Sequence, residues 1–283
     1  MSKKIVSTGS NLLDPVIKIA YEAGDILMEG RKKIKDGNTS FKTDNPNDIL
    51  TEYDLLTEKF ITSKLSETFP DHSLIGEESH GDSTPASLKD DYVWIIDPID
   101  GTLNFSLGRK EFTISIGLFK KGEPFAGVIY APARNEMYYA EKKRGAFLNG
   151  QKISCVSKSL TDTPMHHVQL HKVDVDSLIS DVIQFSAQVK RYGGSAALDL
   201  AMVANGEIDT QLTTSLKIWD IAAAIVIVQE ASGAVLSTDG KTLSFEDDIP
   251  FYSVMAGHKN LLEDLLSRLP RKTVSNIPFG KKY

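Results

Sequence analysis

The sequence predicts a mixed α/β protein in which layers of helix and sheet alternate. Segments with apolar residues at helical spacing alternate along the chain with short runs in which every second residue is apolar. The length of 283 residues is near the upper limit for a single hydrophobic core, so we expect one large domain or two closely packed lobes. Hydrophobic residues make up 41% and charged residues 25%, as in ordinary soluble globular proteins.

Two helices are expected in the N-terminal part of the chain. Asp14-Pro15 is typical of an N-cap followed by proline at the first helical position, and an apolar stripe follows over residues 16–28. Residues 31–46 predict a loop or an irregular strand pair. A second helix should begin near residue 50 and end near residue 68. Its inward-facing side chains are expected to be Leu56, Phe60, Ile61 and Leu65.

The middle of the chain favours strands. Residues 74–76 form a short strand that ends at Glu77-Glu78, and residues 81–90 form a surface loop. Residues 94–96 are an apolar strand, and alternating apolar residues predict a further strand over 112–119. Residues 124–130 and 137–141 are expected to continue from it as an antiparallel meander. Asn149-Gly150 is a strong signal for a hairpin turn.

The C-terminal part should return to alternating helices and strands. Small residues from Ser195, as N-cap, to Asn205 predict a helix that Gly206 ends. The remaining elements are expected at 209–213 (strand), 221–232 (helix), 234–237 (strand), 252–256 (strand) and 260–269 (helix). Residues 162–181 show no clear pattern, and the tail from Pro270 is expected to be loosely held.

Composition excludes several classes of function. No apolar run approaches the roughly 20 residues that a membrane-spanning helix needs, and the N-terminus does not resemble a signal peptide. A net charge of −6 argues against a nucleic-acid partner. The single cysteine, Cys155, is expected to be buried and inert, and it indicates a reducing compartment. We therefore expect a cytoplasmic protein that acts on a small molecule.

The segment from Trp94 to Thr102 is the most informative part of the sequence. An apolar strand leads into Asp97, and Pro98 should end the strand and turn the chain. Asp97, the Ile99 carbonyl and Asp100 would then face one pocket, and three oxygen ligands suit Mg²⁺. Gly101 and Thr102 begin a helix, whose first N–H groups favour a phosphate. The segment therefore predicts metal-assisted phosphate chemistry.

Two further acidic residues, Glu77 and Asp220, stand at the ends of predicted elements. Asp220 precedes the helix from Ile221, so by itself it is also explained as a helix N-cap. Glu77-Glu78 by itself is also explained as a solvated pair in a loop. The pair Asp97 and Asp100 is different, because Gly101 and Thr102, which are expected to bind a phosphate, follow it directly.

Four blocks of the sequence resemble the inositol monophosphatase family. They lie at 75–79, 94–105, 194–198 and 219–223, and the likeness extends from about residue 14 to residue 269. The resemblance implies a layered αβαβα sugar-phosphatase fold with mixed and antiparallel sheets. It implies one phosphatase domain over residues 1–283, with an N-terminal lobe of about 1–155 and a C-terminal lobe of about 156–270. A homodimer is also expected.

The resemblance implies a magnesium site with two ions and a third, weakly held ion near Glu77. Glu77, Asp97 and the carbonyl of Ile99 would bind the first ion. Asp97, Asp100 and Asp220 would bind the second. The four ionised ligands carry −4 and two Mg²⁺ carry +4, which leaves a site that a phosphate dianion can enter.

The same resemblance assigns the catalytic and substrate-binding residues. Asp54 matches an aspartate that orients water, Thr102 matches its partner, and Glu77 is the third catalytic residue. Gly101 and Thr102 would hold the phosphate. The residues expected to contact the substrate are Asp100, Gly194, Ser195, Ala196, Thr213 and Lys217.

The sequence leaves the phosphate ester open. Thr213 stands where the family usually has a glutamate that binds an inositol hydroxyl, which weakens the case for inositol 1-phosphate. Blocks at 111–116 and 127–132 resemble 3′(2′),5′-bisphosphate nucleotidases, and Lys217 is a candidate partner for a second phosphate. Fructose 1,6-bisphosphate and histidinol phosphate are minor options, and lithium inhibition is expected.

Two other features bear on function. Some bacterial members of the family bind the transcription machinery, which is an alternative of another class. His166, His167 and His171 form a cluster, but they lack the pattern of a zinc site, and we expect them at the surface or in the substrate lobe.

Overall fold

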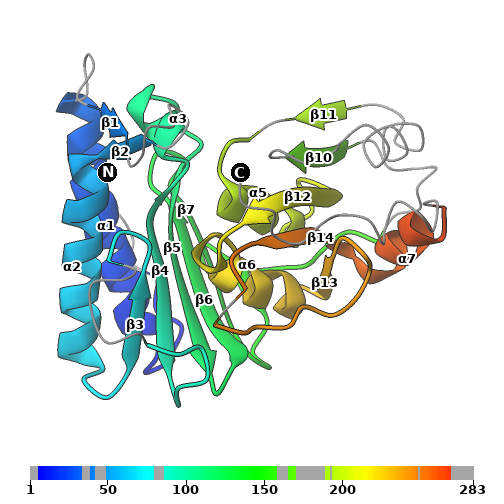
Figure 1. Ribbon diagram of the computed structural model, residues 1–283, viewed down its shortest axis with the longest axis horizontal. Helices are drawn as coiled ribbons and strands as arrows, with labels where there is room; N and C mark the ends of the chain where they lie inside the picture. The colour runs from blue at the N-terminus through cyan, green and yellow to red at the C-terminus, as the bar shows by residue number, and fades with distance from the viewer. Residues whose placement is uncertain are drawn as a thin grey trace.

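The structure is a computed structural model that describes residues 6–33, 39–41, 49–79, 86–157, 165–169, 189–191, 193–247 and 249–268. Figure 1 shows helices and sheets in alternating layers: α1 and α2, a seven-stranded sheet, α5 and α6, a five-stranded sheet, and α7. This order confirms the predicted αβαβα fold. No helix in the described part of the chain is both long enough and apolar enough to span a membrane.

The outer helices α1 (Leu13–Lys33) and α2 (Glu52–Thr68) cover one face of the large sheet. The apolar stripe of α1 is buried as predicted. Asp14 is not the N-cap, because the hydroxyl of Ser10 accepts hydrogen bonds from the N–H groups of Leu12 and Leu13. Asp14 instead accepts hydrogen bonds from the preceding loop. Leu56 was also predicted wrongly, because it is 50% exposed.

Two short strands lie between these helices in sequence. β1 (Thr39–Phe41) pairs antiparallel with β2 (Ile49–Thr51). β1 lies within the segment 31–46 that was predicted as a loop or irregular strand pair, but its partner strand lies beyond that segment. The second helix therefore begins at Glu52, because Leu50 belongs to β2. Residues 31–33, which were predicted to be loop, form the last turn of α1.

The seven-stranded sheet has the order β3-β4-β5-β6-β7-β8-β9. β3 and β4 are parallel, and every following pair is antiparallel. The Asn149-Gly150 turn is confirmed, with φ angles of 50° and 87°. The strands are β3 (Ser73–Gly76), β4 (Val93–Asp100), β5 (Thr113–Lys120), β6 (Glu123–Ala131), β7 (Glu136–Glu141), β8 (Ala146–Leu148) and β9 (Gln151–Ile153).

Helices α5 (Ala196–Ala204) and α6 (Ile218–Glu230) lie between the two sheets and supply most of the central core. The second sheet has the order β11-β10-β12-β14-β13. Its antiparallel part is β12 (Thr210–Leu216), β14 (Tyr252–His258) and β13 (Gly233–Ser237), and β10 (Met165–Gln169) and β11 (Val189–Arg191) extend it in parallel. The helix α7 (Lys259–Arg268) packs its leucines on the outer face of this sheet.

Some predicted features cannot be placed. His166 and His167 belong to β10, whereas His171, most of residues 162–181 and the tail from Pro270 lie outside the described residues. Cys155 is buried, and burial raises the pKa of its thiol to about 12, in agreement with an inert cysteine.

Candidate metal centre

A bulge in β4 turns Asp97 and Asp100 toward the same side. Residues three apart in a regular strand point to opposite faces of the sheet. Here Asp97 pairs with Ser115 and Asp100 pairs with Thr113, so β4 advances by three residues while β5 advances by two. Pro98, which has no N–H group, lies within this irregularity. The strand does not end at Pro98 as predicted; it continues to Asp100.

Helix α6 brings Asp220 to the same place. Asp220 lies in the first turn of the helix, and its side chain accepts a hydrogen bond of 2.6 Å from the backbone N–H of Lys217. The helix approaches the sheet closely because Gly117 and Gly127 have no side chains. A Cβ atom on Gly127 would lie 2.3 Å from the carbonyl oxygen of Ala223 in α6.

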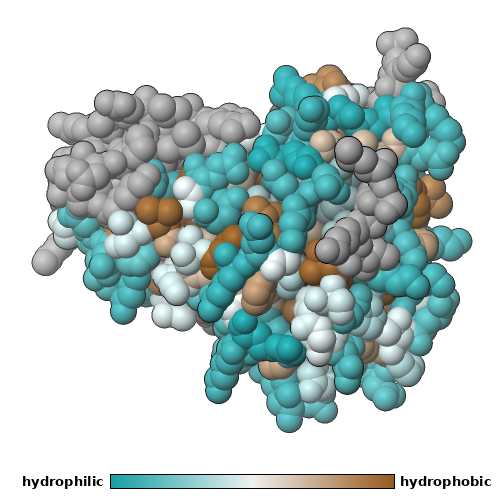
Figure 2. Space-filling model, turned by 180° about the vertical axis from the view of Figure 1, so that it is seen from behind, coloured by the Kyte–Doolittle hydropathy of each residue, from teal (hydrophilic) through white to brown (hydrophobic). Residues whose placement is uncertain are grey.

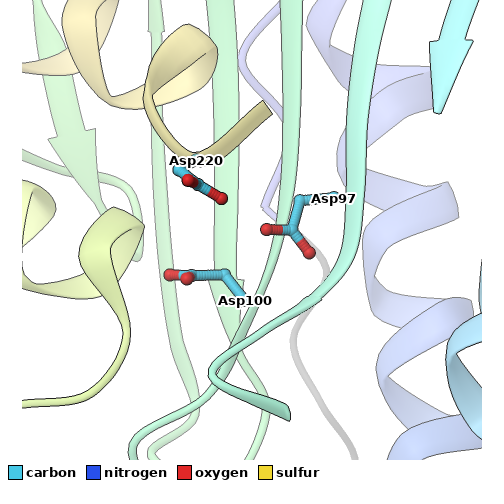
Figure 3. A group of neighbouring side chains, drawn as sticks. All are labelled: Asp97, Asp100 and Asp220. Atoms are coloured by element: carbon cyan, nitrogen blue, oxygen red, sulfur yellow. The ribbon is translucent and has the colours of Figure 1, made fainter. Parts of the chain in front are cut away.

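Three carboxylates converge at this point. Oxygens of Asp97, Asp100 and Asp220 all lie within 4.8 Å of one another, and in Figure 3 the three side chains extend from β4 and α6 toward a common space. Glu77 follows β3, its backbone N–H bonds to the carbonyl of Ile96 at 3.0 Å, and its side chain is hydrogen-bonded to Asp97. The structure therefore brings together all four predicted acidic ligands.

The electrostatics of the cluster favour a bound cation. Burial, and after it the charges of Glu77, Asp100 and Asp220, raise the pKa of Asp97 well above its ordinary value. Burial and the charges of Asp100 and Glu77 do the same to the pKa of Asp220. A donor set made of carboxylate oxygens suits a hard divalent cation, and its charge would offset this repulsion. The residues present therefore fit Mg²⁺.

Asp100 is additionally held by the first turn of α5. Its carboxylate accepts hydrogen bonds from the Ser195 hydroxyl and from the N–H groups of Ala196 at 3.2 Å and Ala197 at 2.7 Å. Burial raises the pKa of Asp100 to about 6, and these hydrogen bonds limit the rise. Ser195 and Ala196, which were predicted to contact the substrate, thus fix a metal-ligand candidate.

Asp54 and Thr102 form a pair beside the cluster. Asp54 is fully buried on α2, and the hydroxyl of Thr102 lies 3.1 Å from its carboxylate and 3.0 Å from the carbonyl of Ile99. Thr102 begins the short helix α3 (Thr102–Ser106). The hydroxyl can donate only one proton at a time, so its lone pairs are available to a water molecule.

Gly101 connects the phosphate-binding segment to the predicted substrate segment. It has φ of +92°, and a Cβ atom there would lie 3.0 Å from the carbonyl of Gly194 and 3.2 Å from Cβ of Ser195. The buried side chain of Asn104 donates hydrogen bonds to the carbonyls of Glu111, at 2.7 Å, and Gly193, at 2.9 Å. These contacts hold α3 against the start of α5.

Thr213 and Lys217 occupy different environments. Thr213 is fully buried in β12, where its hydroxyl accepts a hydrogen bond of 2.6 Å from Gln211. The ammonium of Lys217 lies 4.2 Å from the ring centre of Phe251 and 5.8 Å from that of Trp219. The charge of Lys217 offsets part of the rise in the pKa of Asp220, so this cation acts on the cluster.

Sequence reasoning missed one acidic residue near the site. Glu58 is 4% exposed, and its carboxylate accepts hydrogen bonds of 2.8 Å from the N–H groups of Glu78 and of Ser79. Its position one helical turn after Asp54, on the same face of α2, was the available signal.

Comparison with known proteins agrees with this geometry. The family model of the inositol monophosphatase family matches residues 10–273. An inositol-1-monophosphatase of Bacillus subtilis is 37% identical over 78% of this chain and 85% of its own length. The Nus factor SuhB of Pasteurella multocida is 35% identical over 81% of this chain and 86% of its own length. The crystal structure of the extragenic suppressor protein suhB from Bartonella henselae superposes with a TM-score of 0.80, at 30% identity, over 93% of this chain and 99% of that one.

The matched region includes β4, α5, α6 and all four acidic residues of the cluster. The chain therefore belongs to the inositol monophosphatase family.

Proposed function

We propose that this protein hydrolyses a small phosphate monoester, with inositol 1-phosphate or a related sugar phosphate as its substrate. The family consists of Mg²⁺-dependent phosphatases, and the finer assignment is supported by one observation above all. Three carboxylates lie within 4.8 Å of one another beside the Thr102 and Asp54 pair. This arrangement joins a metal-ligand set to a group that can orient water.

Glu77, Asp97, the Ile99 carbonyl, Asp100 and Asp220 would hold the Mg²⁺ ions. When bound, Mg²⁺ would lower the pKa of a coordinated water and neutralise negative charge on the phosphate.

The protein's own groups would position the reactants. Asp54 accepts a hydrogen bond from the Thr102 hydroxyl, so the Thr102 oxygen can accept a hydrogen bond from the attacking water and orient it in line with the ester bond. The N–H groups of Gly101 and Thr102 would bind the equatorial phosphate oxygens. Ser195 and Ala196 would act through Asp100, which they hold in place.

A substrate panel tests this proposal. We expect phosphate release from inositol 1-phosphate that requires Mg²⁺, stops with a chelator and is inhibited by Li⁺. Adenosine 3′,5′-bisphosphate, fructose 1,6-bisphosphate and histidinol phosphate complete the panel. If none of the four is hydrolysed in the presence of Mg²⁺, the proposal is wrong.

The surroundings of Lys217 favour adenosine 3′,5′-bisphosphate as the second candidate substrate. Phe251 is 42% exposed and offers an aromatic face directly beside the Lys217 ammonium. A cation and an exposed ring next to a metal centre suit a substrate with a second phosphate and a nucleobase. The variant Lys217→Gln should then raise KM for the bisphosphate more than for inositol 1-phosphate. An equal effect on both would contradict this preference.

The Nus factor relative supports a second function of another class. Because that protein is about as similar to this chain as the inositol-1-monophosphatase is, binding to the transcription machinery is a separate proposal. Pull-down of RNA polymerase by the wild type and by Asp97→Asn tests it. Equal capture by both would show binding that is independent of catalysis, and no capture by either would refute it.

A further inference from the structure

We infer that Glu58 is a positioning residue that sets the affinity of the metal centre by fixing the backbone of the Glu77 loop. This inference rests on the proposed function, because it assumes that Glu77 contributes to a magnesium site. Glu58 itself does not belong to the carboxylate cluster. Its carboxylate faces the backbone of the segment that follows β3.

The loop from Glu77 to Ser79 is held by three consecutive N–H groups. The N–H of Glu77 bonds to the carbonyl of Ile96 in β4, at 3.0 Å. The N–H groups of Glu78 and Ser79 bond to one carboxylate oxygen each of Glu58, both at 2.8 Å. A carboxylate that receives two backbone N–H groups makes strong, charge-assisted hydrogen bonds. The loop is therefore fastened to β4 on one side and to α2 on the other.

The contact between Glu58 and the strand leaves no room for a side chain. A Cβ atom on Gly76, the residue before Glu77, would lie 2.5 Å from the carboxylate carbon of Glu58 and 2.5 Å from its Oε1. A glycine at this point lets the carboxylate approach the backbone directly. Two independent features, the paired hydrogen bonds and Gly76, thus place Glu58 under the loop.

This arrangement connects two parts of the site. Asp54 and Glu58 are one helical turn apart on the buried face of α2. Asp54 contacts Thr102, whereas Glu58 holds the backbone beside Glu77, whose side chain is hydrogen-bonded to Asp97. The helix α2 therefore fixes the position of the Asp54 and Thr102 pair relative to the Glu77 loop. Residues that orient metal ligands typically change metal affinity or activity by about 10- to 100-fold when they are replaced.

The test compares Mg²⁺ binding by the wild type, Glu58→Gln and Glu67→Gln. Glutamine keeps the shape of Glu58 but places an NH₂ group against one of the two backbone donors. Glu67→Gln is the matched control, because Glu67 is an exposed residue of the same helix that pairs with Lys64. Calorimetric titration and the Mg²⁺ dependence of Tm should give a Kd about 10- to 100-fold higher for Glu58→Gln and unchanged for Glu67→Gln. Activity of Glu58→Gln should recover at saturating Mg²⁺.

A second variant separates position from charge. Glu58→Asp keeps the negative charge but is one methylene shorter, so it cannot reach both donors, and its Kd should rise as well. A wild-type Kd in either folded variant would overturn the inference. Loss of the folded circular dichroism spectrum in both variants would also overturn it, because Glu58 would then be a structural residue only. If the wild type itself binds no Mg²⁺, it is the proposed function that fails.

Discussion

Replacing Asp97 with asparagine should stabilise the metal-free protein and at the same time remove its activity. Asp97 is 2% exposed, and its carboxylate accepts a hydrogen bond of 3.0 Å from the N–H of Ile99. Asparagine keeps an oxygen for that N–H group. Its NH₂ group can also donate to the carboxylate of Glu77, where two acidic side chains now meet.

The size of the effect follows from the spacing of the carboxylates. Two unit charges 4.8 Å apart repel by roughly 3.5 kcal/mol at an effective dielectric constant of about 20. Asp97 takes part in two of the three such pairs among the aspartates. Because the pKa values of these carboxyl groups are raised, some of the groups bind a proton at neutral pH, which relieves a large part of this repulsion. We therefore expect a gain of about 2 kcal/mol in the free energy of unfolding, which is about 3–4 °C in Tm for a chain of 283 residues.

This change in Tm is measured by thermal unfolding in the presence of a chelator at pH 7.5, followed by a titration with Mg²⁺. Asp97→Asn should unfold at a higher temperature than the wild type without metal, and only the wild type should gain Tm from Mg²⁺. The control Asp91→Asn makes the same charge change at a side chain that is 79% exposed. A metal-free Tm for Asp97→Asn equal to or below that of the wild type would refute the reasoning.

The same experiment has a defined pH dependence. The pKa of Asp100 in the folded protein is about 6, above its ordinary 3.8, so the folded state binds the proton more tightly than the unfolded state does. The stability from this proton is complete below pH 3.8 and is lost as the pH rises through about 6. The loss amounts to roughly 3 kcal/mol for this one group. The metal-free wild type should therefore lose Tm from pH 4 to pH 7, and its difference from Asp97→Asn should shrink at low pH.

Three further predictions concern other parts of the site and fold. Thr102→Ala should lower kcat by about 10²- to 10⁴-fold with little change in Mg²⁺ affinity, because it removes the group that orients water beside Asp54; an unchanged kcat would exclude this role. Gly127→Ala should cost about 1–3 kcal/mol in unfolding free energy and weaken Mg²⁺ binding, because its Cβ would push α6 away at Ala223; wild-type stability in denaturant would contradict this packing. Cys155 should react with a thiol reagent only after unfolding, and fast reaction of the native protein would contradict its burial.

The order of elements and the acidic ligands could be predicted from the sequence because local patterns encode them. The apolar stripe of α1, the Asn149-Gly150 turn and the Ser195 cap each depend on residues close in sequence. The sequence-based predictions were wrong where contacts between residues far apart in the sequence determine the structure. Leu56 fits the apolar pattern of α2, but the helix turns its buried face so that Asp54 and Glu58 point inward.

The bulge in β4 could not be predicted for a related reason. Pro98 indicated the end of a strand, because proline donates no ladder hydrogen bond. In the fold, β5 supplies pairing on both sides of the proline, through Ser115 to Asp97 and through Thr113 to Asp100. Only the partner strand shows that the chain continues, and it is the extra residue that turns both carboxylates to one side.

The contacts of the surrounding elements hold these carboxylates close together. Each one is carried by an element that other contacts fix. The bulged β4 lies inside the sheet, and α6 packs on Gly117 and Gly127. Asp100 accepts three hydrogen bonds from the N-cap Ser195 and the first two residues of α5. Because the repulsion is imposed by the rest of the fold, a cation that enters relieves it and gains affinity from that relief. Stability without metal and affinity for metal are therefore opposed at these positions. Substitutions of these carboxylates that stabilise the metal-free protein should lower its affinity for Mg²⁺.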